Sequence, residues 1–474
     1  MTPHRRALAI VCAVVAVSAC GSGKTAAPPA GGTDWPLYGY TSARSNSGPA
    51  STGITAANVA QLRRQRMTLD GTVDSSPIYL HGVRVLGAPH DAFFVTTTYG
   101  KTEAIDASTG RVLWRWTPPG YRSWAGSYRI TTATPAADPS RAWIYAASPD
   151  GRIQKLSVAS GRAAWRVRVT LLPTREKIPA ALNYRRGRVI VATGGYIGDA
   201  PPYQGHVAIV DARRGRLLRV WNSLCSNRHR LISPSSCAAS GSAIWARSGA
   251  VADPATGALL AATGNGDWNG KTNWGDSVVR LKGDASRLLG SWTPTDEAAL
   301  AAQDADLGST APALLGGGLA VQGGKDGKLR LLDLGRLAPA GRRGGEVQTV
   351  ATPGSIDLFT TPAVWHSGAT TWIFVGDDAG LAAWTLSGRR LHRAWGNGSA
   401  STSPVVAGGL LYAYDPGGRL RVYDPKTGRR LADLQAGRGH WNSPIVADGL
   451  VALPEGDAND HRTTGVLNVY RLPS

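Results

Sequence analysis

The sequence predicts an all-β fold, an eight-bladed β-propeller whose blades are four-stranded antiparallel sheets. Two markers recur in order along the 474 residues. One marker joins an apolar strand, an Asp or a substitute, a small turn with Gly and a strand that ends in Trp. The other is a small residue followed by Pro in front of an apolar strand. Eight ordered copies of both markers are typical of a propeller rather than of unrelated hairpins.

The first marker combines the residues that a tight turn between the third and the outermost strand requires. In its fullest copy, Gly110 follows Thr109 and supplies the positive φ of the turn, and the Asp106 carboxylate is placed to bond the turn amides. Trp114 is expected to pack between neighbouring sheets. The copies lie at residues 103–114, 154–165, 208–218, 279–292, 330–334, 382–395 and 421–434, with a truncated last strand at 467–472.

The second marker sets the length of the repeat unit. It stands at Pro77, Pro135, Pro179, Pro312, Pro362, Pro404 and Pro444, and Ser248 with Gly249 replaces it in one unit. Successive markers are separated by 40 residues at the shortest, from Pro404 to Pro444, and by 70 at the longest, from Pro179 to Gly249. Four short strands with variable loops fit this spacing, and the alternation in residues 420–423 is that of a strand. We therefore expect residues 35–474 to form a single propeller domain.

The N-terminus has the pattern of an export signal. Arg5 and Arg6 precede an apolar run over residues 7–17, which leads into Val-Ser-Ala-Cys at Cys20. The run is too short to cross a bilayer of about 30 Å as a helix. We expect residues 1–19 to be a lipoprotein signal peptide, Cys20 to carry the lipid and residues 20–34 to be a flexible tether. The expected location is the outer face of the cytoplasmic membrane, in the cell envelope.

The remaining cysteines form one isolated pair. Cys12 lies in the signal peptide and Cys20 carries the lipid, which leaves Cys225 and Cys237. In an oxidising compartment these two are expected to form a disulfide that pins the long insertion at residues 222–243. Their spacing matches no zinc motif. The insertion either covers the central channel or decorates the surface.

The formal net charge is +20, and the basic residues are dispersed along the chain. Anionic lipid headgroups or cell-wall polymers are natural partners for such a chain, although a solvated arginine-rich surface explains the same composition. Nucleic acid is excluded as a partner, because the sequence has no basic helix and no aromatic RNA-binding motif. The sequence also has no His-Glu-x-x-His, no nucleophile elbow and no Walker loop.

The repeat Ala-x-Asp-x-x-Thr-Gly-x-x-x-Trp resembles that of pyrroloquinoline-quinone (PQQ) proteins. These include quinoprotein alcohol dehydrogenases and non-catalytic assembly-factor lipoproteins. Residues 35–39, Arg44 and residues 54–62 also resemble the N-terminal segment of PQQ alcohol dehydrogenases. The resemblance implies a PQQ- and calcium-dependent oxidoreductase acting on alcohols or sugars. The alternative is a non-catalytic binding or scaffold propeller with a small-molecule ligand or a cell-envelope partner.

Three segments resemble the cofactor site of these dehydrogenases. Residues 263–278 are similar to the calcium-binding asparagine segment, which implies Asn265 as a metal ligand. Residues 303–309 are similar to the segment of the catalytic aspartate, which implies Asp304 as both metal ligand and base. Lys325 is similar to the lysine that polarises the quinone, although a plain Asp-Gly blade turn explains the same residues.

Other positions match the family less closely. Trp245 stands near the position of the tryptophan under the cofactor, and Arg129 near that of a cofactor-binding arginine. The calcium glutamate of the family has no counterpart, and its blade offers the shorter Asp199 as a metal ligand. The vicinal cysteine pair and a haem-binding Cys-x-x-Cys-His are absent, so an enzyme would need a separate electron acceptor. We interpret His90 and His440 as structural histidines.

Overall fold

A computed structural model describes Met1, residues 32–338 and residues 341–473 of the chain. The predicted signal peptide, Cys20 and all but the end of the predicted tether lie outside the described residues. Within these ranges, no helix has both the length and the apolar composition needed to span a membrane.

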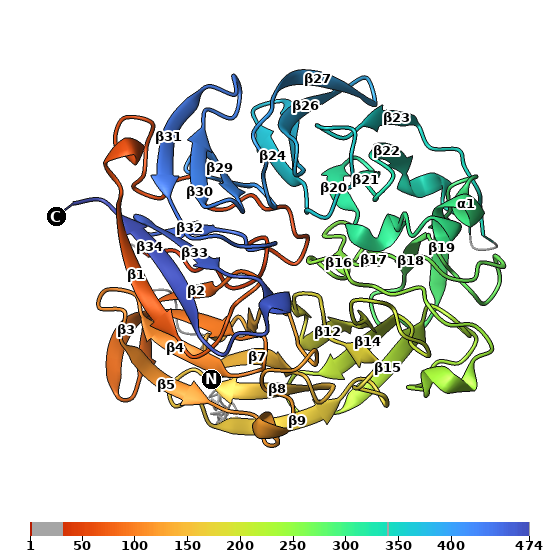
Figure 1. Cartoon of the computed structure of the whole chain (residues 1–474), viewed down its shortest axis with the longest axis horizontal. Helices are drawn as coiled ribbons and strands as arrows, with labels where there is room; N and C mark the ends of the chain where they lie inside the picture. The colour runs from red at the N-terminus through yellow and green to blue at the C-terminus, as the bar shows by residue number, and fades with distance from the viewer. Residues whose placement is uncertain (2–31, 339–340, 474) are drawn as a thin grey trace.

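The strands form a ring of eight four-stranded antiparallel sheets, so the predicted eight-bladed propeller is confirmed (Figure 1). Blade 1 comprises β2 (Ile78–Val85), β3 (Ala88–Thr96), β4 (Thr102–Asp106) and β5 (Val112–Trp116), and blade 2 comprises β6 (Ala136–Ala137), β7 (Trp143–Ser148), β8 (Arg152–Ser157) and β9 (Ala163–Arg168). Blade 3 comprises β11 (Asn183–Arg185), β12 (Arg188–Ala192), β14 (His206–Asp211) and β15 (Leu217–Asn222), and blade 4 comprises β16 (Val251–Ala252), β17 (Leu259–Ala262), β18 (Val278–Leu281) and β19 (Leu288–Trp292). Blade 5 comprises β20 (Ala313–Gly316), β21 (Leu319–Gln322), β22 (Lys328–Asp333) and β23 (Gln348–Ala351), and blade 6 comprises β24 (Ala363–Ser367), β25 (Thr370–Gly376), β26 (Leu381–Ser387) and β27 (Arg390–Asn397). Blade 7 comprises β28 (Val405–Ala407), β29 (Leu410–Asp415), β30 (Arg419–Tyr423) and β31 (Arg430–Gln435), and blade 8 comprises β32 (Ile445–Ala447), β33 (Leu450–Glu455), β34 (Gly465–Arg471) and β1 (Arg63–Leu69).

The other elements are short. A two-stranded pair joins β10 (Glu176–Lys177) to β13 (Gly194–Gly195). The helices are α1 (Glu297–Ala302) and the 3-10 turns η1 (Val59–Gln61), η2 (Tyr121–Ser123), η3 (Pro234–Ser236), η4 (Leu307–Ser309), η5 (Leu334–Arg336) and η6 (Ala458–Asp460). The ring itself is therefore built from strands alone.

Blade 8 is completed by the two ends of the chain. β1 supplies its outermost strand and pairs antiparallel with β34, from Arg63 opposite Arg471 to Leu69 opposite Gly465. The two strands lie side by side at the left of Figure 1. The sequence markers predicted the strand near the C-terminus but not its partner, because β1 carries neither marker.

The two halves of the first marker meet across the boundary between blades. A Cβ added at Gly161 would lie 2.5 Å from the Trp114 side chain, and one added at Gly215 would lie 2.5 Å from Trp165. In blades 1, 2 and 6, the Trp therefore packs on the turn glycine of the next blade. At the ring closure, Met67 of β1 takes the place of Trp and lies 2.9 Å from the same point on Gly110.

Replacing Gly161 with Ala should lower the free energy of unfolding by about 2–3 kcal/mol, because the φ of +69° strains Ala and the new methyl displaces Trp114. Gly187→Ala is the matched control. Its φ is +75°, but nothing lies within 4 Å of the added carbon, so about 1 kcal/mol of backbone strain is expected. Urea unfolding measures both, and equal losses would contradict the contact across the blade boundary.

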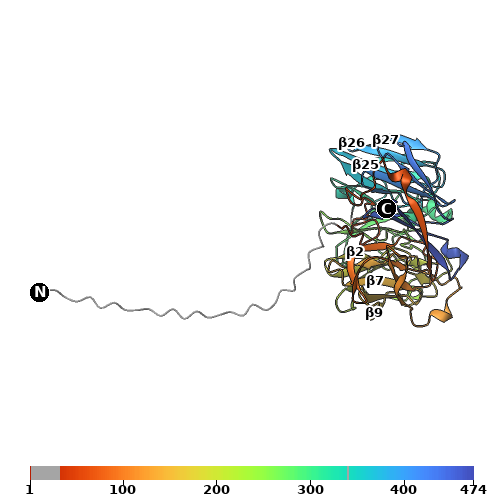
Figure 2. The same ribbon diagram turned by 90° about the vertical axis from the view of Figure 1, so that its left-hand side faces the viewer.

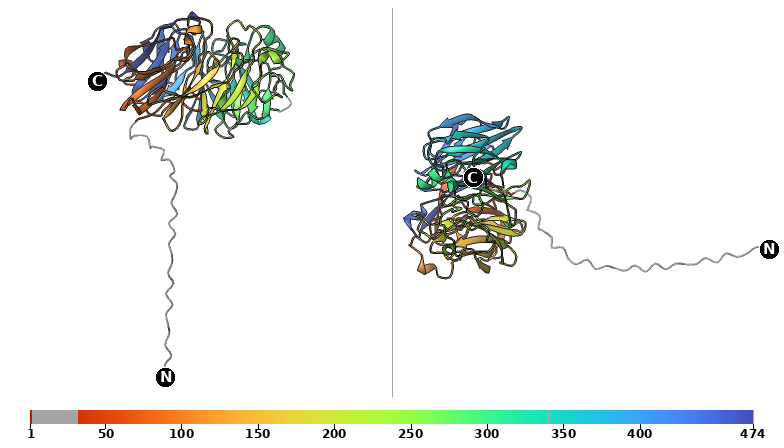
Figure 3. Two further views of the ribbon diagram at one scale, coloured as in Figure 1. Left: turned by 90° about the horizontal axis from the view of Figure 1, so that it is seen from below. Right: turned by 90° about the vertical axis from the view of Figure 1, so that its right-hand side faces the viewer.

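The connections between strands alternate between two faces of the ring, which the side views show as a thick disc (Figures 2 and 3). We call the side with the turns between first and second and between third and fourth strands the turn face. The loops from second to third strand, and from each blade to the next, lie on the opposite side, which we call the cavity face.

The segment from Thr33 to Thr52 closes the centre of the ring at the turn face. Its backbone bonds the innermost strands of five blades, through Tyr79 of β2, Ala137 of β6, Ala252 of β16, Val364 of β24 and Val406 of β28. Trp35 and Tyr38 are buried inside it. Arg44 is also buried and donates from its guanidinium to the carbonyls of Tyr38, Ala181 and Leu182. We call this segment, residues 33–52, the plug. The plug and the strands of the described residues all lie within residues 33–473, which therefore form a self-contained unit.

Candidate functional site

Loops of the cavity face surround a cavity of about 570 Å³. The structure brings five of the six predicted cofactor and metal residues to its wall, namely Asp199, Trp245, Asn265, Asp304 and Lys325. Arg129 does not line it. Its guanidinium lies over Trp124, bonds the carbonyl of Pro149 and contacts the Tyr196 side chain from behind the wall.

Lys325 joins two of the aspartates. It precedes the Asp-Gly turn before β22, and its Nζ lies 3.0 Å from Asp304 Oδ2 and 2.5 Å from Asp306 Oδ2. Although burial alone would lower the pKa of Lys325, its pairing with Asp306 raises that pKa above the ordinary value. Lys325 is therefore charged at neutral pH. The Asp304 side chain remains 63% exposed, so it faces the open part of the cavity.

Asp306 was not predicted as a site residue, yet it is the most enclosed of these groups. Its Oδ1 accepts from the backbone N–H of Asn265 at 2.7 Å, while the Asn265 amide donates to Asp304 Oδ1 at 2.8 Å. A Cβ at Gly264 would lie 2.2 Å from Asp306 Oδ1, so only glycine allows this approach. Burial raises the pKa of Asp306, and the ion pair with Lys325 opposes the rise. The signal for this residue was the second Asp in the 304–306 segment.

A buried carboxyl stands behind this group. Asp276 Oδ1 accepts from the backbone N–H of Leu307 at 2.9 Å, while Oδ2 is buried without a hydrogen-bond partner. Burial, with the neighbouring charges of Asp306 and Glu297, raises the pKa of Asp276 to about 8. Asp276 is therefore neutral in the folded protein at pH 7.

The contribution of Asp276 to the free energy of unfolding should fall as pH rises from about 4 to about 8. The reason is that the Asp276 carboxyl ionises near pH 3.9 in the unfolded chain but only near pH 8 in the folded protein. In that window the folded state binds the extra proton, and above pH 8 the contribution is constant. Asp276→Asn should remove this part of the slope. Urea midpoints at pH 5, 7 and 9 check the prediction, which an unchanged slope in the variant would contradict.

Three aromatic side chains form the apolar surface of the cavity. Phe359 and Trp441 stack with centroids 5.2 Å apart, and Trp245 lies 6.0 Å from each. The loops that carry them lead into blades 4, 6 and 8, which explains why sequence reasoning found only Trp245. The Lys325 Nζ lies 5.5 Å above the Trp245 ring.

A second charged cluster borders the aromatic surface. Asp74, which is 1% exposed, accepts from Arg247 Nη2 at 3.1 Å and lies 2.8 Å from His440 Nδ1. Burial alone would raise the pKa of Asp74, but Arg247 and His440 lower it far below the ordinary range. The sequence analysis set His440 aside as structural. The structure confirms a contact with a buried carboxylate but also places its ring at the cavity, stacked on Trp441.

The loop between β13 and β14 forms another part of the cavity wall. Here Asp199 receives a hydrogen bond from the Tyr203 hydroxyl, while burial raises the Asp199 pKa. Lys177 lies nearby, and burial together with Arg247 lowers the pKa of Lys177 to about 8. The cavity thus has three basic groups, Lys177, Arg247 and Lys325.

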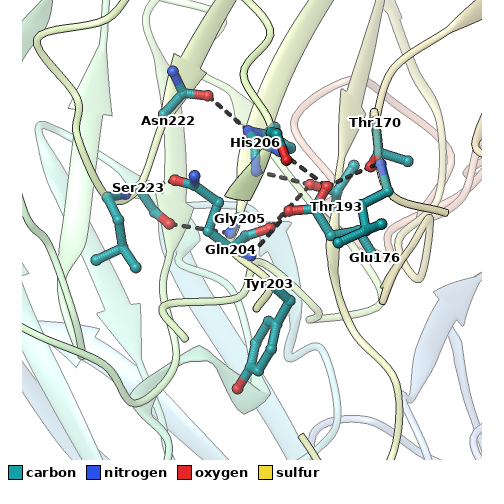
Figure 4. A network of polar contacts seen from close by, with 12 residues as sticks. Thr170, Glu176, Thr193, Tyr203, Gln204, Gly205, His206, Asn222 and Ser223 are labelled. Carbon is teal, nitrogen blue, oxygen red and sulfur yellow. Dashed lines mark hydrogen bonds and ion pairs between the residues drawn. The ribbon is translucent and has the colours of Figure 1, made fainter. Parts of the chain in front are cut away.

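A buried polar network holds this loop in place (Figure 4). His206 Nδ1 lies 2.7 Å from Asn222 Oδ1, and His206 Nε2 lies 3.2 Å from Glu176 Oε2. Glu176 also accepts from the backbone N–H of Gln204 at 3.0 Å. The His206 and Glu176 side chains are both fully buried. Their bonds to each other and to Gln204 hold the start of β14, which follows Tyr203.

The predicted disulfide between Cys225 and Cys237 is confirmed. The insertion that it closes is joined to the cavity wall by Gln204, whose amide oxygen accepts from Leu224 N–H at 3.1 Å. Of its residues 222–243, Ala243 alone lines the described cavity.

Comparison with known proteins gives one family and a consistent set of relatives. The profile of a family described as outer membrane protein assembly factor BamB matches residues 63–269. The quinohemoprotein alcohol dehydrogenase ADH IIB of Pseudomonas putida is 27% identical over 227 residues, 45% of this chain and 30% of that protein. The dehydrogenase subunit of the quinone-dependent alcohol dehydrogenase of Acetobacter aceti is 24% identical over 56% of this chain and 39% of its own length. The chain thus spans well under half of these curated relatives.

Solved structures show the same fold over almost the whole chain. The quinohemoprotein alcohol dehydrogenase of Comamonas testosteroni aligns with a TM-score of 0.69 and 16% identity over 93% of this chain and 80% of that one. A europium-containing methanol dehydrogenase gives 0.68 and 17% over 93% and 98%. BamB of Moraxella catarrhalis gives 0.53 and 12% over 86% and 97%.

Proposed function

We propose that the chain is a propeller of the PQQ-repeat, quinoprotein alcohol dehydrogenase-like superfamily, and that its cavity binds PQQ and oxidises alcohols or sugars. The observation that carries the proposal is the convergence of an aromatic surface, three basic groups and the Asp304–Lys325 pair in one cavity.

The wall fits a planar anionic quinone. Trp245, Phe359 and Trp441 offer ring faces for stacking, which stabilises flat ligands. Lys177, Arg247 and Lys325 offer charge for carboxylate and quinone oxygens. When bound, PQQ supplies the capacity to accept two electrons from the substrate.

The chain supplies proton transfer and orientation. The Asp304 side chain is exposed to the cavity, so its carboxylate is placed to accept the hydroxyl proton of an alcohol. Lys325 holds that carboxylate on one side, and the Asn265 amide holds it on the other. Asp306 keeps Lys325 charged, which preserves a donor for an anionic oxygen.

The donors for a cation are all oxygens, as Ca²⁺ prefers. Asp199, Asn265 and Asp304 would hold it, and each lines the cavity. In the described residues, Asp199 bonds Tyr203 and Asp304 bonds Lys325, so a bound cation competes with these contacts.

The test is a titration of residues 33–474 with PQQ, followed by quenching of tryptophan fluorescence, with and without Ca²⁺. Eu³⁺ luminescence serves as a second cation readout. Trp245→Leu should weaken PQQ at least about tenfold, whereas Trp143→Leu, outside the cavity, should leave the affinity unchanged. Affinity should fall above pH 8 as Lys177 loses its proton, and Lys177→Met should remove that dependence. Absence of PQQ binding overturns the proposal.

A non-catalytic binding or scaffold propeller is the second candidate function. It is favoured by the direct pairing of Asp304 with Lys325, which engages the base and the quinone-binding lysine with each other. Dye-linked oxidation of a panel of alcohols and sugars separates the two functions. PQQ binding without oxidation of any tested substrate, seen as no reduction of the added dye, supports the scaffold.

Lipidation of Cys20 and export to the outer face of the cytoplasmic membrane belong to the same proposal. The support is the lipobox at residues 17–20. Metabolic labelling with a fatty acid should mark the intact chain but not a Cys20→Ala variant. A soluble, unlabelled wild-type protein contradicts the anchor.

A further inference from the structure

Seven acidic residues of the described ring are exposed on its cavity face. They belong to loops between second and third strands or between blades. They are Asp199, Asp267, Asp296, Asp304, Asp357, Asp378 and Asp460. The cavity face therefore carries most of the accessible negative charge of the described residues, although on the turn face the Asp91 side chain is 43% exposed and lies 3.1 Å from His81 Nδ1.

The turn face has the opposite character. Exposed basic residues follow the turn glycine of blade after blade, as Arg111 follows Gly110 and Arg162 follows Gly161. The turns between third and fourth strands expose Arg111, Arg162, Arg213, Arg214, Arg216, Lys282, Arg287, Arg336, Arg389, Lys426 and Arg429. These turns recur at the rims of blades 1 to 7, and in blade 8 the exposed Arg63 at the start of β1 lies on the same side, so the charges form a ring around the face.

The acids in the turns between third and fourth strands do not protrude with them. Asp211 Oδ1 accepts from the backbone N–H groups of Arg213 and Arg214, and Asp424 does the same for Lys426 and Thr427. The carboxylates are thus folded back onto their own turns and only partly exposed, while the guanidinium groups extend outward. A flat surface brought to this face meets the basic groups first.

One part of the face is hollowed. A cavity of about 390 Å³ between the turns of blades 3 and 4 is lined by Arg185, Arg186, Arg188 and Lys282, with Asp284 as the one acid. Guanidinium and ammonium groups arranged in this way suit a phosphate group.

The chain also enters the ring at this face. The Thr33 backbone N–H donates to Asp448 in the first turn of blade 8, and Asp34 pairs with Arg141 in the first turn of blade 2. Thr33 therefore lies on the basic side of the disc, away from the cavity.

We propose that the turn face docks on an anionic phospholipid bilayer, with its arginine ring on lipid phosphates and the cavity directed away from the membrane. The charge complementarity fits an anionic surface, and the position of Thr33 favours a membrane over a soluble polymer, because the lipid proposed above on Cys20 would bring this face to the bilayer. This surface is separate from the cavity, so the inference does not depend on what the cavity binds.

The experiment measures co-sedimentation of residues 33–474 with vesicles. Vesicles of phosphatidylglycerol and phosphatidylcholine should bind the protein, and pure phosphatidylcholine should not. Raising NaCl from about 0.05 to 0.3 M should weaken binding at least about tenfold, because exposed charges are screened. Unchanged binding in salt, or equal binding to neutral vesicles, overturns the inference.

Matched charge reversals locate the surface. The triple variant Arg213→Glu, Arg214→Glu, Arg216→Glu should lose about tenfold or more in vesicle affinity. The control Arg122→Glu, Arg438→Glu, Arg462→Glu changes net charge equally on exposed residues of the cavity face and should change affinity less than twofold. Equal losses would show a net-charge effect and overturn the docking face. Binding to soluble polyphosphate but not to vesicles would assign the face to an anionic polymer instead. PQQ affinity should be the same in both variants.

Discussion

Replacing Asp74 with Asn should destabilise the protein by about 3–5 kcal/mol, because it leaves the buried Arg247 guanidinium without its counter-charge. Arg247 is only 6% exposed, and its other contacts are the carbonyls of Asp74 and Thr132 and the ring of Trp441, all of them uncharged. Asn would also lose the acceptor that His440 and the Ala458 N–H share. The junction between the loops entering blades 1, 4 and 8 would therefore loosen.

The same residue predicts an acid dependence. Since its pKa in the folded state lies far below the unfolded value near 3.9, the contribution of Asp74 is complete above about pH 5. It is lost as pH falls below that unfolded value. The Asn variant should be less sensitive to acid over that range. Urea unfolding at pH 3, 5 and 7 measures both effects.

Asp333→Asn provides the control for this prediction. Asp333 pairs with Arg389, but the Arg389 side chain is 54% exposed, so the loss should stay below about 1 kcal/mol. A similar loss in the two variants would contradict the buried-charge explanation.

Trp35→Ala should lower the free energy of unfolding by about 3–5 kcal/mol, because Trp35 is completely buried in the plug and its removal leaves a cavity. It packs in the cluster that joins blades 1, 7 and 8, together with Tyr79, Val405 and Val451. That cluster includes Met67 and Leu69 of β1, so the substitution weakens the ring closure as well.

The plug prediction has its own control. Trp143 begins β7 and is partly exposed, so Trp143→Ala should cost less than half as much. Thermal and urea unfolding of both variants measure the difference. A Trp35 variant as stable as the Trp143 variant would mean that the plug does not support the ring.

The sequence alone determined the number and phase of the blades. Turn chemistry and strand alternation are local properties, so Thr109 with Gly110, or Pro404 before β28, report their structure without knowledge of distant residues. The resemblance to PQQ proteins rested on the same repeats, and it led to Trp245, Asn265, Asp304, Lys325 and Asp199, which line one cavity.

The tertiary structure decided which distant segments meet. β1 completes blade 8 although it lacks both markers, because its pairing with β34 spans the two ends of the chain. Asp306, Phe359, Trp441 and the Asp74–Arg247–His440 cluster reach the cavity from loops of different blades. Their juxtaposition depends on closure of the ring, and no periodicity along the sequence encodes it.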